Sequence, residues 1–476
     1  MTIKFGTDGW RAVISDTFTF ANLRLVAQAV ADYVCEESGG GRPEVIVGFD
    51  TRFLSDRYAA EVACVLAGNG IVAHLTRADA PTPAVSYAVV HKKANAGVMI
   101  TASHNPPRYN GFKLKAAFGG AALPEQAKCI EDHLKRNQEA VHGPYVMDYQ
   151  VALEQGLVRR FDPAWPYYEH LGQLINMDVI SDGELLVVTD SMYGSGRKCL
   201  ADMLARTRCE VHEIRGEMNP GFGGIHPEPI ACYLNALEAA IQAYHADLGL
   251  ATDGDGDRIG AMDGRGEFVD PHHIFALVLR HLVEERGWSG KVVKSVSTTR
   301  MVDRLAARYN LPLVETPVGF NYIADTMLNG DVLMGGEESG GMSIKGHIPE
   351  GDGVLMGLLL LEVVAAAGVS LHELVDGLQA DVGPTCYTRR DLPLRHPVGK
   401  ADMVARLTQD VPGSLGGQEI VEVRTLDGVK YLLADDSWLL IRPSGTEPVL
   451  RVYAEARDEA MVGVLLAYGQ QLAAGS

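Results

Sequence analysis

The sequence predicts an α/β protein with three similar α/β units and a C-terminal α+β unit. Strand-like apolar runs alternate with amphipathic helical patterns along most of the 476 residues, as expected for largely parallel sheets. Three of these runs lead directly into polar, glycine-rich loops. The C-terminal part changes to a strand–turn–strand pattern followed by a helix, which indicates a different unit.

The three strands that lead into the loops begin near Gly97, Leu248 and Val332. Amphipathic helices are expected over Leu23–Val34, Asn235–Tyr244 and Met301–Tyr309. Other strands are expected over Val45–Phe49, Leu185–Thr189 and Val292–Val296. Ligands of such sheets bind in crevices outside the carboxyl ends of the strands, so we expect the three loops to face a common cleft.

The chain length suggests three to four compact units. We expect a first unit with a serine loop over residues 1–150, a second with an aspartate loop over 151–265, and a third with a glutamate loop over 266–380. The fourth unit, 381–476, follows the Pro- and Arg-containing stretch Asp381–Lys400. It contains the strand Trp438–Arg442, the turn Pro443–Pro448 and a strand from Val449.

Composition and charge exclude several classes of protein. With 47% apolar and 22% charged residues the chain is ordinary globular protein, and its longest apolar run, Val354–Leu361, is too short to span a membrane. The start, Met1–Asp8, has no apolar signal core, so a cytoplasmic protein is expected. The expected state is a monomer or dimer without a membrane partner. Seven scattered cysteines without a C-x-x-C pair favour reduced thiols over zinc or disulfides.

The net charge of −19 argues against nucleic acid as a partner, because a phosphate backbone needs a basic surface. A small phosphate ligand remains possible if the cations gather in one cleft.

Asp253, Asp255 and Asp257 alternate with glycines at the end of a strand. Three carboxylates on such a flexible segment can converge into the hard oxygen site that Mg²⁺ prefers. An EF-hand is excluded, because its sixth position would be Arg258 instead of glycine and its twelfth Gly264 instead of glutamate. An Asp/Gly turn is the alternative, but strict alternation of three aspartates favours a metal site.

Ser103 also lies at a strand end, in the segment Thr101-Ala-Ser-His-Asn-Pro-Pro107. It lacks the G-x-S-x-G pattern of an acyl-transferring serine. A serine that accepts phosphate needs a metal and cations nearby, and Lys113 and Lys115 follow on one face of a strand. An ordinary surface turn and a solvated strand face are the alternatives for these segments.

The third loop, Gly336–Gly341, carries Glu337 and Ser339, which are suited to vicinal sugar hydroxyls because the glycines allow close approach. Lys345 and His347 follow, and either is a candidate cation or proton relay of the same site.

The C-terminal turn offers a phosphate site, in which two arginines bracket hydroxyls and turn amides: Arg442, Ser444, Gly445, Thr446 and Arg451. A simple hairpin turn is the alternative. Near the start, Gly6–Arg11 is another glycine-rich segment that ends in a cation. The candidate cations therefore gather at the loops: Arg11, Lys113, Arg258, Lys345, Arg442 and Arg451.

Together these motifs resemble, in order from Phe5 to Tyr453, the α-D-phosphohexomutases, the phosphoglucomutase/phosphomannomutase family. The resemblance implies four domains around a central cleft and a phosphate carried on Ser103. It implies that Mg²⁺ is bound by Ser103, Asp253, Asp255 and Asp257. It further implies that the sugar is gripped by Glu337 and Ser339, and that the non-transferring phosphate is clamped by Arg442, Ser444, Gly445 and Thr446.

The resemblance also implies a mechanism. The phosphoserine gives its phosphoryl group to a hexose phosphate, and the bisphosphate, such as glucose 1,6-bisphosphate, turns over and returns its other phosphate. Mg²⁺ and Arg258 would neutralise the transferring group, with Lys113 or His104 as general base. Two cations frequent in the family are replaced by Asn321 and Gly351, for which Arg258 and Lys345 would compensate.

The expected function is thus interconversion of glucose 1-phosphate and glucose 6-phosphate. A mannose or glucosamine mutase, a glucose 1,6-bisphosphate synthase, a phosphatase and a non-catalytic sugar-phosphate binding protein are the alternatives. The intact Ser103 and three aspartates argue against the last of these.

Overall fold

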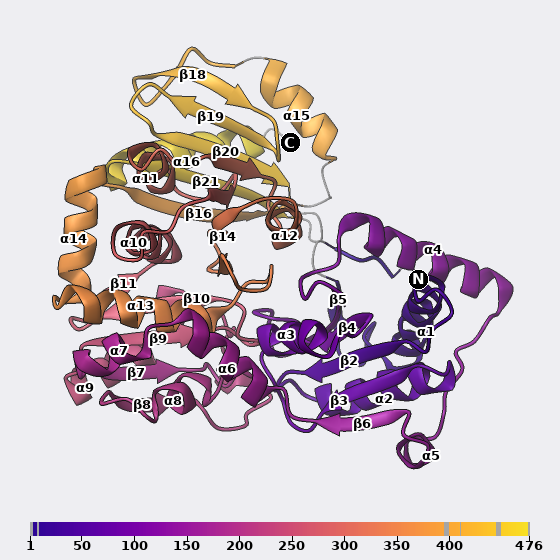
Figure 1. The fold of residues 1–476 in the computed structure, drawn as a ribbon. Helices are drawn as coiled ribbons and strands as arrows, with labels where there is room; N and C mark the ends of the chain where they lie inside the picture. The colour runs from indigo at the N-terminus through magenta and orange to yellow at the C-terminus, as the bar shows by residue number, and fades with distance from the viewer. Residues whose placement is uncertain (1–2, 7–8, 395–398, 410, 444–448, 475–476) are drawn as a thin grey trace.

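The computed structural model describes residues 3–6, 9–394, 399–409, 411–443 and 449–474, which form four sheets with their helices (Figure 1). The first sheet has the order β1-β5-β4-β2-β3-β6. Its strands are β1 Trp10–Val13, β2 Glu44–Phe49, β3 Val72–Thr76, β4 Ala96–Ile100, β5 Tyr109–Ala116 and β6 Val158–Phe161. Its helices are α1 Phe20–Glu37, α2 Ser55–Gly68, α3 Thr82–Lys92, α4 Pro124–Ala140 and α5 Tyr149–Glu154.

The second sheet has the order β11-β10-β9-β7-β8 and the third the order β13-β12-β14-β15. The strands of the second sheet are β7 Leu186–Asp190, β8 Glu210–Ile214, β9 Leu248–Thr252, β10 Ile259–Asp263 and β11 Phe268–Val269. Its helices are α6 Ala164–Leu174, α7 Met177–Gly183, α8 Cys199–Leu204 and α9 Asn235–Tyr244. The strands of the third sheet are β12 Lys291–Ser295, β13 Leu313–Thr316, β14 Val332–Gly336 and β15 Met342–Ile344. Its helices are α10 Pro271–Glu284, α11 Met301–Arg308, α12 Phe320–Leu328, α13 Gly353–Ala367 and α14 Leu371–Val382.

The fourth sheet, in the order β16-β21-β20-β19-β18-β17, is antiparallel throughout. Its strands are β16 Cys386–Pro393, β17 Ser414–Leu415, β18 Gln418–Arg424, β19 Val429–Leu433, β20 Trp438–Pro443 and β21 Val449–Ala456, and its helices are α15 Lys400–Gln409 and α16 Glu459–Ala474. Three α/β units followed by an α+β unit are therefore confirmed.

The first three sheets share one arrangement. Each has a parallel core, and the last parallel strand turns back through a loop into an antiparallel neighbour: β4 into β5, β9 into β10, and β14 into β15. The sequence predicted the three strands and their loops, but not the antiparallel return. Because both ends of each loop are fixed in a sheet, the loop tips have defined positions at the carboxyl ends of the strands.

The sheets and cores do not follow the expected units at every point. Strand β6, Val158–Phe161, pairs with β3 of the first sheet although it follows residue 150. The second and third sheets share one apolar core, which continues across the expected boundary near residue 265. Helix α13 is buried from Gly353 to Val364 and packs against α7 and α8 of the second sheet as well as α10 of the third. A helix that is apolar on all sides is a core element.

Among the described residues, no single helix is long and apolar enough to cross a membrane. Within this part of the chain, α13 and α14 reach that length and composition only when taken together, with a bend of 85° between them.

Candidate active site

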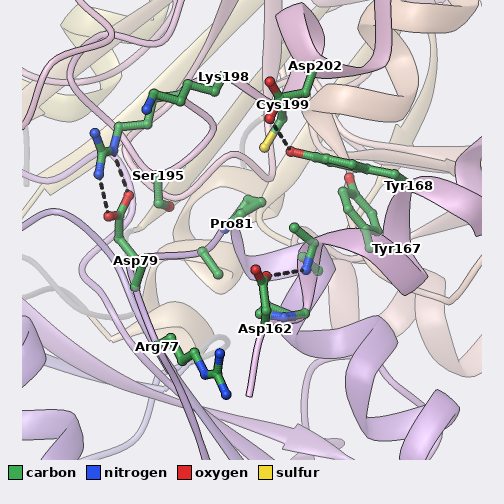
Figure 2. Close-up of a pocket in the computed structure, with 16 residues that line it drawn as sticks. Arg77, Asp79, Pro81, Asp162, Tyr167, Tyr168, Ser195, Lys198, Cys199 and Asp202 are labelled. Atoms are coloured by element: carbon green, nitrogen blue, oxygen red, sulfur yellow. Dashed lines mark hydrogen bonds and ion pairs between the residues drawn. The ribbon is translucent and has the colours of Figure 1, made fainter. Parts of the chain in front are cut away.

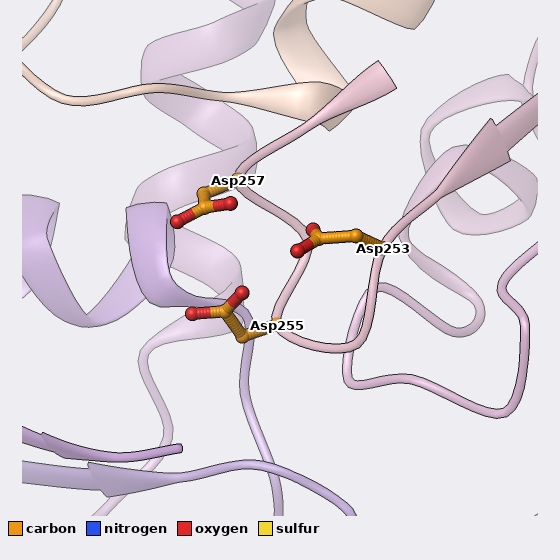
Figure 3. Close-up of side chains that lie close together, drawn as sticks. All are labelled: Asp253, Asp255 and Asp257. Carbon is orange, nitrogen blue, oxygen red and sulfur yellow. The ribbon is translucent and has the colours of Figure 1, made fainter. Parts of the chain in front are cut away.

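The three aspartates of the β9–β10 loop converge on one point (Figure 3). One carboxylate oxygen from each of Asp253, Asp255 and Asp257 lies within 4.8 Å of the others. Asp253 and Asp255 are fully buried. Gly254 permits the close packing of this loop, because a Cβ there would lie 2.5 Å from the carbonyl oxygen of Ser103. The loop thus presents a compact cluster of carboxylates directly beside the serine loop.

The cluster fits a divalent cation. Oδ1 of Asp255 and Oδ1 of Asp257 are buried and have no hydrogen-bond partner among the described residues, so each has a free lone pair. The Lys113 ammonium lies 2.9 Å from Oδ2 of both carboxylates and partly balances their charge. A set of hard, mostly buried oxygen ligands is the chemistry that Mg²⁺ requires.

Ser103 contacts this cluster. Its Oγ donates a hydrogen bond of 2.9 Å to Oδ2 of Asp253 and lies 3.3 Å from Nδ1 of His104. Ser103 is completely buried and has a positive φ of 52°, in the left-handed region that L residues seldom adopt. The structure therefore brings the predicted serine and the predicted aspartates, 150 residues apart in sequence, into direct contact.

The local charges shift two pKa values in opposite senses. Burial and the carboxylates of Asp257 and Asp255 raise the pKa of Asp253 well above its usual range. Burial in the cleft, together with the guanidinium groups of Arg258 and Arg11, lowers the pKa of His104 well below its usual value. A neutral His104 beside the Ser103 hydroxyl is able to accept a proton.

The lysines of β5 are buried and do not form a solvated face. Lys113 and Lys115 are 1% and 0% exposed. Lys113 contacts the aspartate cluster of the second unit, whereas Nζ of Lys115 donates to Glu350 of the third unit at 2.6 Å. The two lysines thus connect the first unit to both of its neighbours.

The third loop holds two adjacent glutamates in different environments. Oε1 of Glu337 accepts from the amide of Gly319 at 2.7 Å, and burial together with the neighbouring Glu338 raises the pKa of Glu337 to about 7. Glu338 accepts from the hydroxyl of Ser297 at 2.6 Å. Ser339 lies partly exposed in the same loop.

The fourth unit contributes arginines from neighbouring strands. Arg442 and Arg451 are paired across β20 and β21, and Nε of Arg442 lies 3.0 Å from Asp427. Arg389 of β16 was missed by the sequence analysis; it lies two residues before Asp391, which pairs with Arg451 across the sheet. Its charge contributes to the lowered pKa of His104, so it lies within electrostatic range of the serine loop. Ser444, Gly445 and Thr446 lie outside the described residues.

Arg11 and Arg258 lie beside the first two loops. Nη1 of Arg11 donates to Oδ1 of Asn105 at 2.8 Å, within the serine loop. Nε of Arg258 lies 3.8 Å from Oδ1 of Asp257, and its Nη1 lies 3.9 Å from Glu228.

Two predicted residues lie elsewhere. Lys345 is exposed and pairs with Asp331 at 2.6 Å. It lies opposite Leu333, at the far end of the β14–β15 pair from Glu337, so it does not take the place of the missing cations. His347 is buried and its Nε2 lies 3.0 Å from Asp352, in a contact that anchors the start of α13. The geometry gives neither residue a place at the aspartate cluster.

The structure shows the surroundings of the two positions at which this chain lacks a cation that is frequent in the family. A Cβ at Gly351 would lie 2.9 Å from the carbonyl oxygen of Asp257, so the backbone occupies the space that a side chain would need. Asn321, near the start of α12, is 3% exposed and its Oδ1 has no hydrogen-bond partner among the described residues.

A cavity of about 230 Å³ lies between the first and second units (Figure 2). The paired Arg197 and Asp79 line it, together with Pro81. The next residue, Thr82, donates to Oδ2 of Asp255 at 2.6 Å. None of the three aspartates lines this cavity, so it is separate from the carboxylate cluster.

Sequence profiles of one family match the chain in order. They are described as phosphoglucomutase/phosphomannomutase alpha/beta/alpha domains I, II and III and C-terminal domain, and they match residues 2–141, 165–266, 270–381 and 398–467.

Full-length relatives agree with these profiles. A phosphoglucomutase/phosphomannomutase of Thermococcus kodakarensis is 30% identical, with 98% of each chain covered. A phosphoglucosamine mutase of Frankia casuarinae is 34% identical, covering 100% of this chain and 98% of the relative. A crystal structure of a candidate phosphomannomutase from Thermus thermophilus has a TM-score of 0.86 at 36% identity, with 100% of both chains covered.

The fold and these matches define an enzyme of the phosphohexomutase class, which transfers a phosphate group within a sugar. The chain belongs to the phosphoglucomutase/phosphomannomutase family.

We predict that Glu337→Gln removes a pH dependence of stability. The pKa of Glu337 rises from 4.5 to about 7 on folding, so protonation of Glu337 stabilises the folded protein. This stabilisation is fully present below pH 4.5 and is lost as the pH rises through 7. At pH 8 the variant should melt about 2–4 °C above the unsubstituted protein, and at pH 5 the two should melt together.

Glu338→Gln is the companion variant. The charge of Glu338 helps to raise the pKa of Glu337, so its removal relieves repulsion only where Glu337 is ionised, and the melting temperature should fall less at pH 8 than at pH 5. An equal shift for Glu337→Gln at pH 5 and pH 8 would contradict the prediction.

Proposed function

We propose that the protein is a magnesium-dependent phosphohexomutase that interconverts hexose 1-phosphates and hexose 6-phosphates, preferring glucose, through a phosphorylated Ser103. The observation that carries this proposal is the 2.9 Å hydrogen bond between Oγ of Ser103 and Asp253 of the three-carboxylate cluster. A phosphoryl group on this oxygen would lie against the cluster and the nearby cations, which is the arrangement that phosphoryl transfer needs.

The first half-reaction transfers the phosphoryl group from Ser103 to the free hydroxyl of the hexose phosphate. The bond between phosphorus and Oγ breaks and Oγ takes up a proton, while a bond to the sugar oxygen forms and the sugar hydroxyl releases its proton. His104 is the favoured acceptor of this proton, since its Nδ1 lies 3.3 Å from Oγ of Ser103. Lys113 is the less favoured base, because it already bonds two carboxylates.

The second half-reaction is the reverse, with the other phosphate of the bisphosphate. Oγ of Ser103 loses its proton and attacks that phosphorus, the bond to the second sugar oxygen breaks, and this oxygen takes up a proton. The sugar must therefore bind in two orientations. Glucose 1,6-bisphosphate is the proposed intermediate and activator.

The remaining site residues would hold the sugar and its second phosphate. Glu337 and Ser339 lie in one loop, between β14 and β15, and would bond vicinal hydroxyls of the sugar. The phosphate clamp is proposed from the fourth unit and comprises Arg442, Ser444, Gly445, Thr446 and Arg451. Arg11 and Arg258 would supply positive charge beside the transferring group.

The metal would be held by Asp253, Asp255, Asp257 and a phosphate oxygen on Ser103. When bound, Mg²⁺ supplies positive charge that stabilises the transferring phosphoryl group. An Aspergillus fumigatus N-acetylphosphoglucosamine mutase of the same fold, 16% identical with a TM-score of 0.61, was solved with magnesium and GlcNAc-6P, so the fold accommodates both kinds of ligand.

We predict that the purified protein carries one phosphate, on Ser103. Ser103→Ala should abolish turnover and carry no phosphate while keeping its melting temperature, because a loop hydroxyl is replaced without a core cavity. Intact-mass and peptide mass spectrometry measure this. Ser339→Ala, the control, should remain phosphorylated. A phosphate mapped to another residue would refute this assignment.

Removal of metal should stop the reaction. We expect EDTA to abolish activity and Mg²⁺ to restore it, and Asp255→Asn to lower kcat by more than about tenfold because the cluster loses a charge. The exposed Asp331→Asn should leave kcat unchanged. Full activity of the chelated protein, measured with glucose 1-phosphate, would exclude the metal site.

Glucose 1-phosphate should be preferred over mannose 1-phosphate by roughly tenfold to a hundredfold in kcat/KM. The two sugars differ in the orientation of the 2-hydroxyl, and one misplaced hydrogen bond costs about 1–3 kcal/mol. The assay uses both substrates and glucosamine 1-phosphate, each with a trace of glucose 1,6-bisphosphate. A higher value for mannose or glucosamine would assign the enzyme to that sugar, in line with the phosphomannomutase and phosphoglucosamine mutase relatives.

Release of free phosphate or of bisphosphate in the same assay would instead indicate a phosphatase or a bisphosphate synthase. Binding of the sugar phosphates without turnover would indicate a binding protein.

A further inference from the structure

Arg52, which follows β2, is buried beneath the serine loop and donates hydrogen bonds to four of its carbonyl groups. Nη1 donates to the carbonyls of Pro106 at 2.9 Å and Tyr109 at 3.1 Å. Nη2 donates to those of Ser103 and Asn105. The Arg52 side chain has no exposed surface. A planar guanidinium has five N–H donors spread over three nitrogens and can span separated acceptors, whereas an ammonium group has three donors on one atom and reaches fewer of them.

Asp50 joins Arg52 to the other side of the Ser103 peptide. Its Oδ2 lies 3.1 Å from Nε of Arg52 and accepts from Oγ1 of Thr101 at 2.6 Å. The same Thr101 oxygen accepts from the amide of Ser103 at 2.9 Å. The carbonyl of Ser103 is therefore fixed by Arg52 and its amide by Thr101, in one buried network of three side chains.

This network explains how Ser103 keeps an unfavourable backbone conformation. The positive φ of 52° places Cβ of an L residue close to its own backbone, and such conformations persist only where the surroundings fix them. Hydrogen bonds at both the amide and the carbonyl supply that constraint. The conformation in turn directs Oγ toward Asp253.

The same guanidinium contacts the second unit. Cζ of Arg52 lies 4.8 Å from the ring centre of Phe222, a cation–π contact. Beside it, the hydroxyl of Thr51 donates to the carbonyl of Tyr193 at 2.7 Å. The segment that holds the serine loop is thus also docked onto the unit that carries the aspartates.

We propose that Arg52 is a positioning residue for phosphoryl transfer, which holds Ser103 in its left-handed conformation so that Oγ stays directed at the carboxylate cluster. This inference rests on the proposed function, in which Ser103 carries the phosphoryl group. Arg52 acts through the backbone of the loop, so its shape matters more than its charge.

The test measures kcat and KM for glucose 1-phosphate with a trace of glucose 1,6-bisphosphate. Arg52→Lys keeps the charge but loses the four-carbonyl contact, and kcat should fall by about tenfold to a hundredfold, since small displacements of a reacting group are costly. KM should change by less than about twofold, because substrate groups are untouched. Arg57→Lys, at an exposed site near by in sequence, is the control and should keep both constants.

Thr101→Val provides a second, independent variant that preserves side-chain shape. It should also lower kcat at nearly constant KM, which keeps the proposal testable if Arg52→Lys does not fold. In both variants the ³¹P resonance of the phosphoserine should shift, whereas Arg57→Lys should leave it in place.

Wild-type kcat in folded Arg52→Lys and Thr101→Val, even with lowered melting temperatures, would overturn the proposal, since the network would then be only structural. A rise in KM without a fall in kcat would overturn it as well. If the unsubstituted protein carries no phosphate on Ser103, the proposed function has failed instead, so the two failures are distinguishable.

Discussion

Three carboxylates held within 4.8 Å of one another in a mostly buried loop are the constraint on which the rest of the structure depends. Such a group repels itself, and burial removes the water that would screen it. Lys113 of the first unit and Arg258 of the loop itself supply positive charge that offsets this repulsion. The charge balance of one loop therefore requires a second unit to dock against it, and this docking also brings Ser103 to Asp253.

The sequence predicted the features that are encoded locally. The alternation of Asp253, Asp255 and Asp257 and the strand before Ser103 were sufficient to locate two loops of the site, and helices such as α9 begin and end as expected. Positions that depend on strand register were not predictable in this way. Lys345 lies only a few residues after Ser339, yet the antiparallel return of β15 carries it to the opposite end of the strand pair.

Sequence motifs also could not predict hydrogen-bond partners that lie far apart in the sequence. Lys115 donates a hydrogen bond to Glu350, which is 235 residues away. Asp255 accepts one from Thr82, which is 173 residues away. Neither Glu350 nor Thr82 belongs to a pattern that distinguishes it from an ordinary polar residue. For Arg389 a signal did exist, since it alternates with Asp391 on a strand and so shares a face with it. Only the fold shows that the charge of Arg389 acts on His104.

The apolar core shared by the second and third units has a consequence for how such a gene can be rearranged. Helix α13 belongs to the third unit in sequence but packs against α7 and α8 of the second. A fragment that stops between the two units would leave a wide apolar face exposed to water, and it would aggregate more readily than it would fold. Exchange of segments between related genes is therefore expected to succeed at the ends of this double unit and to fail within it.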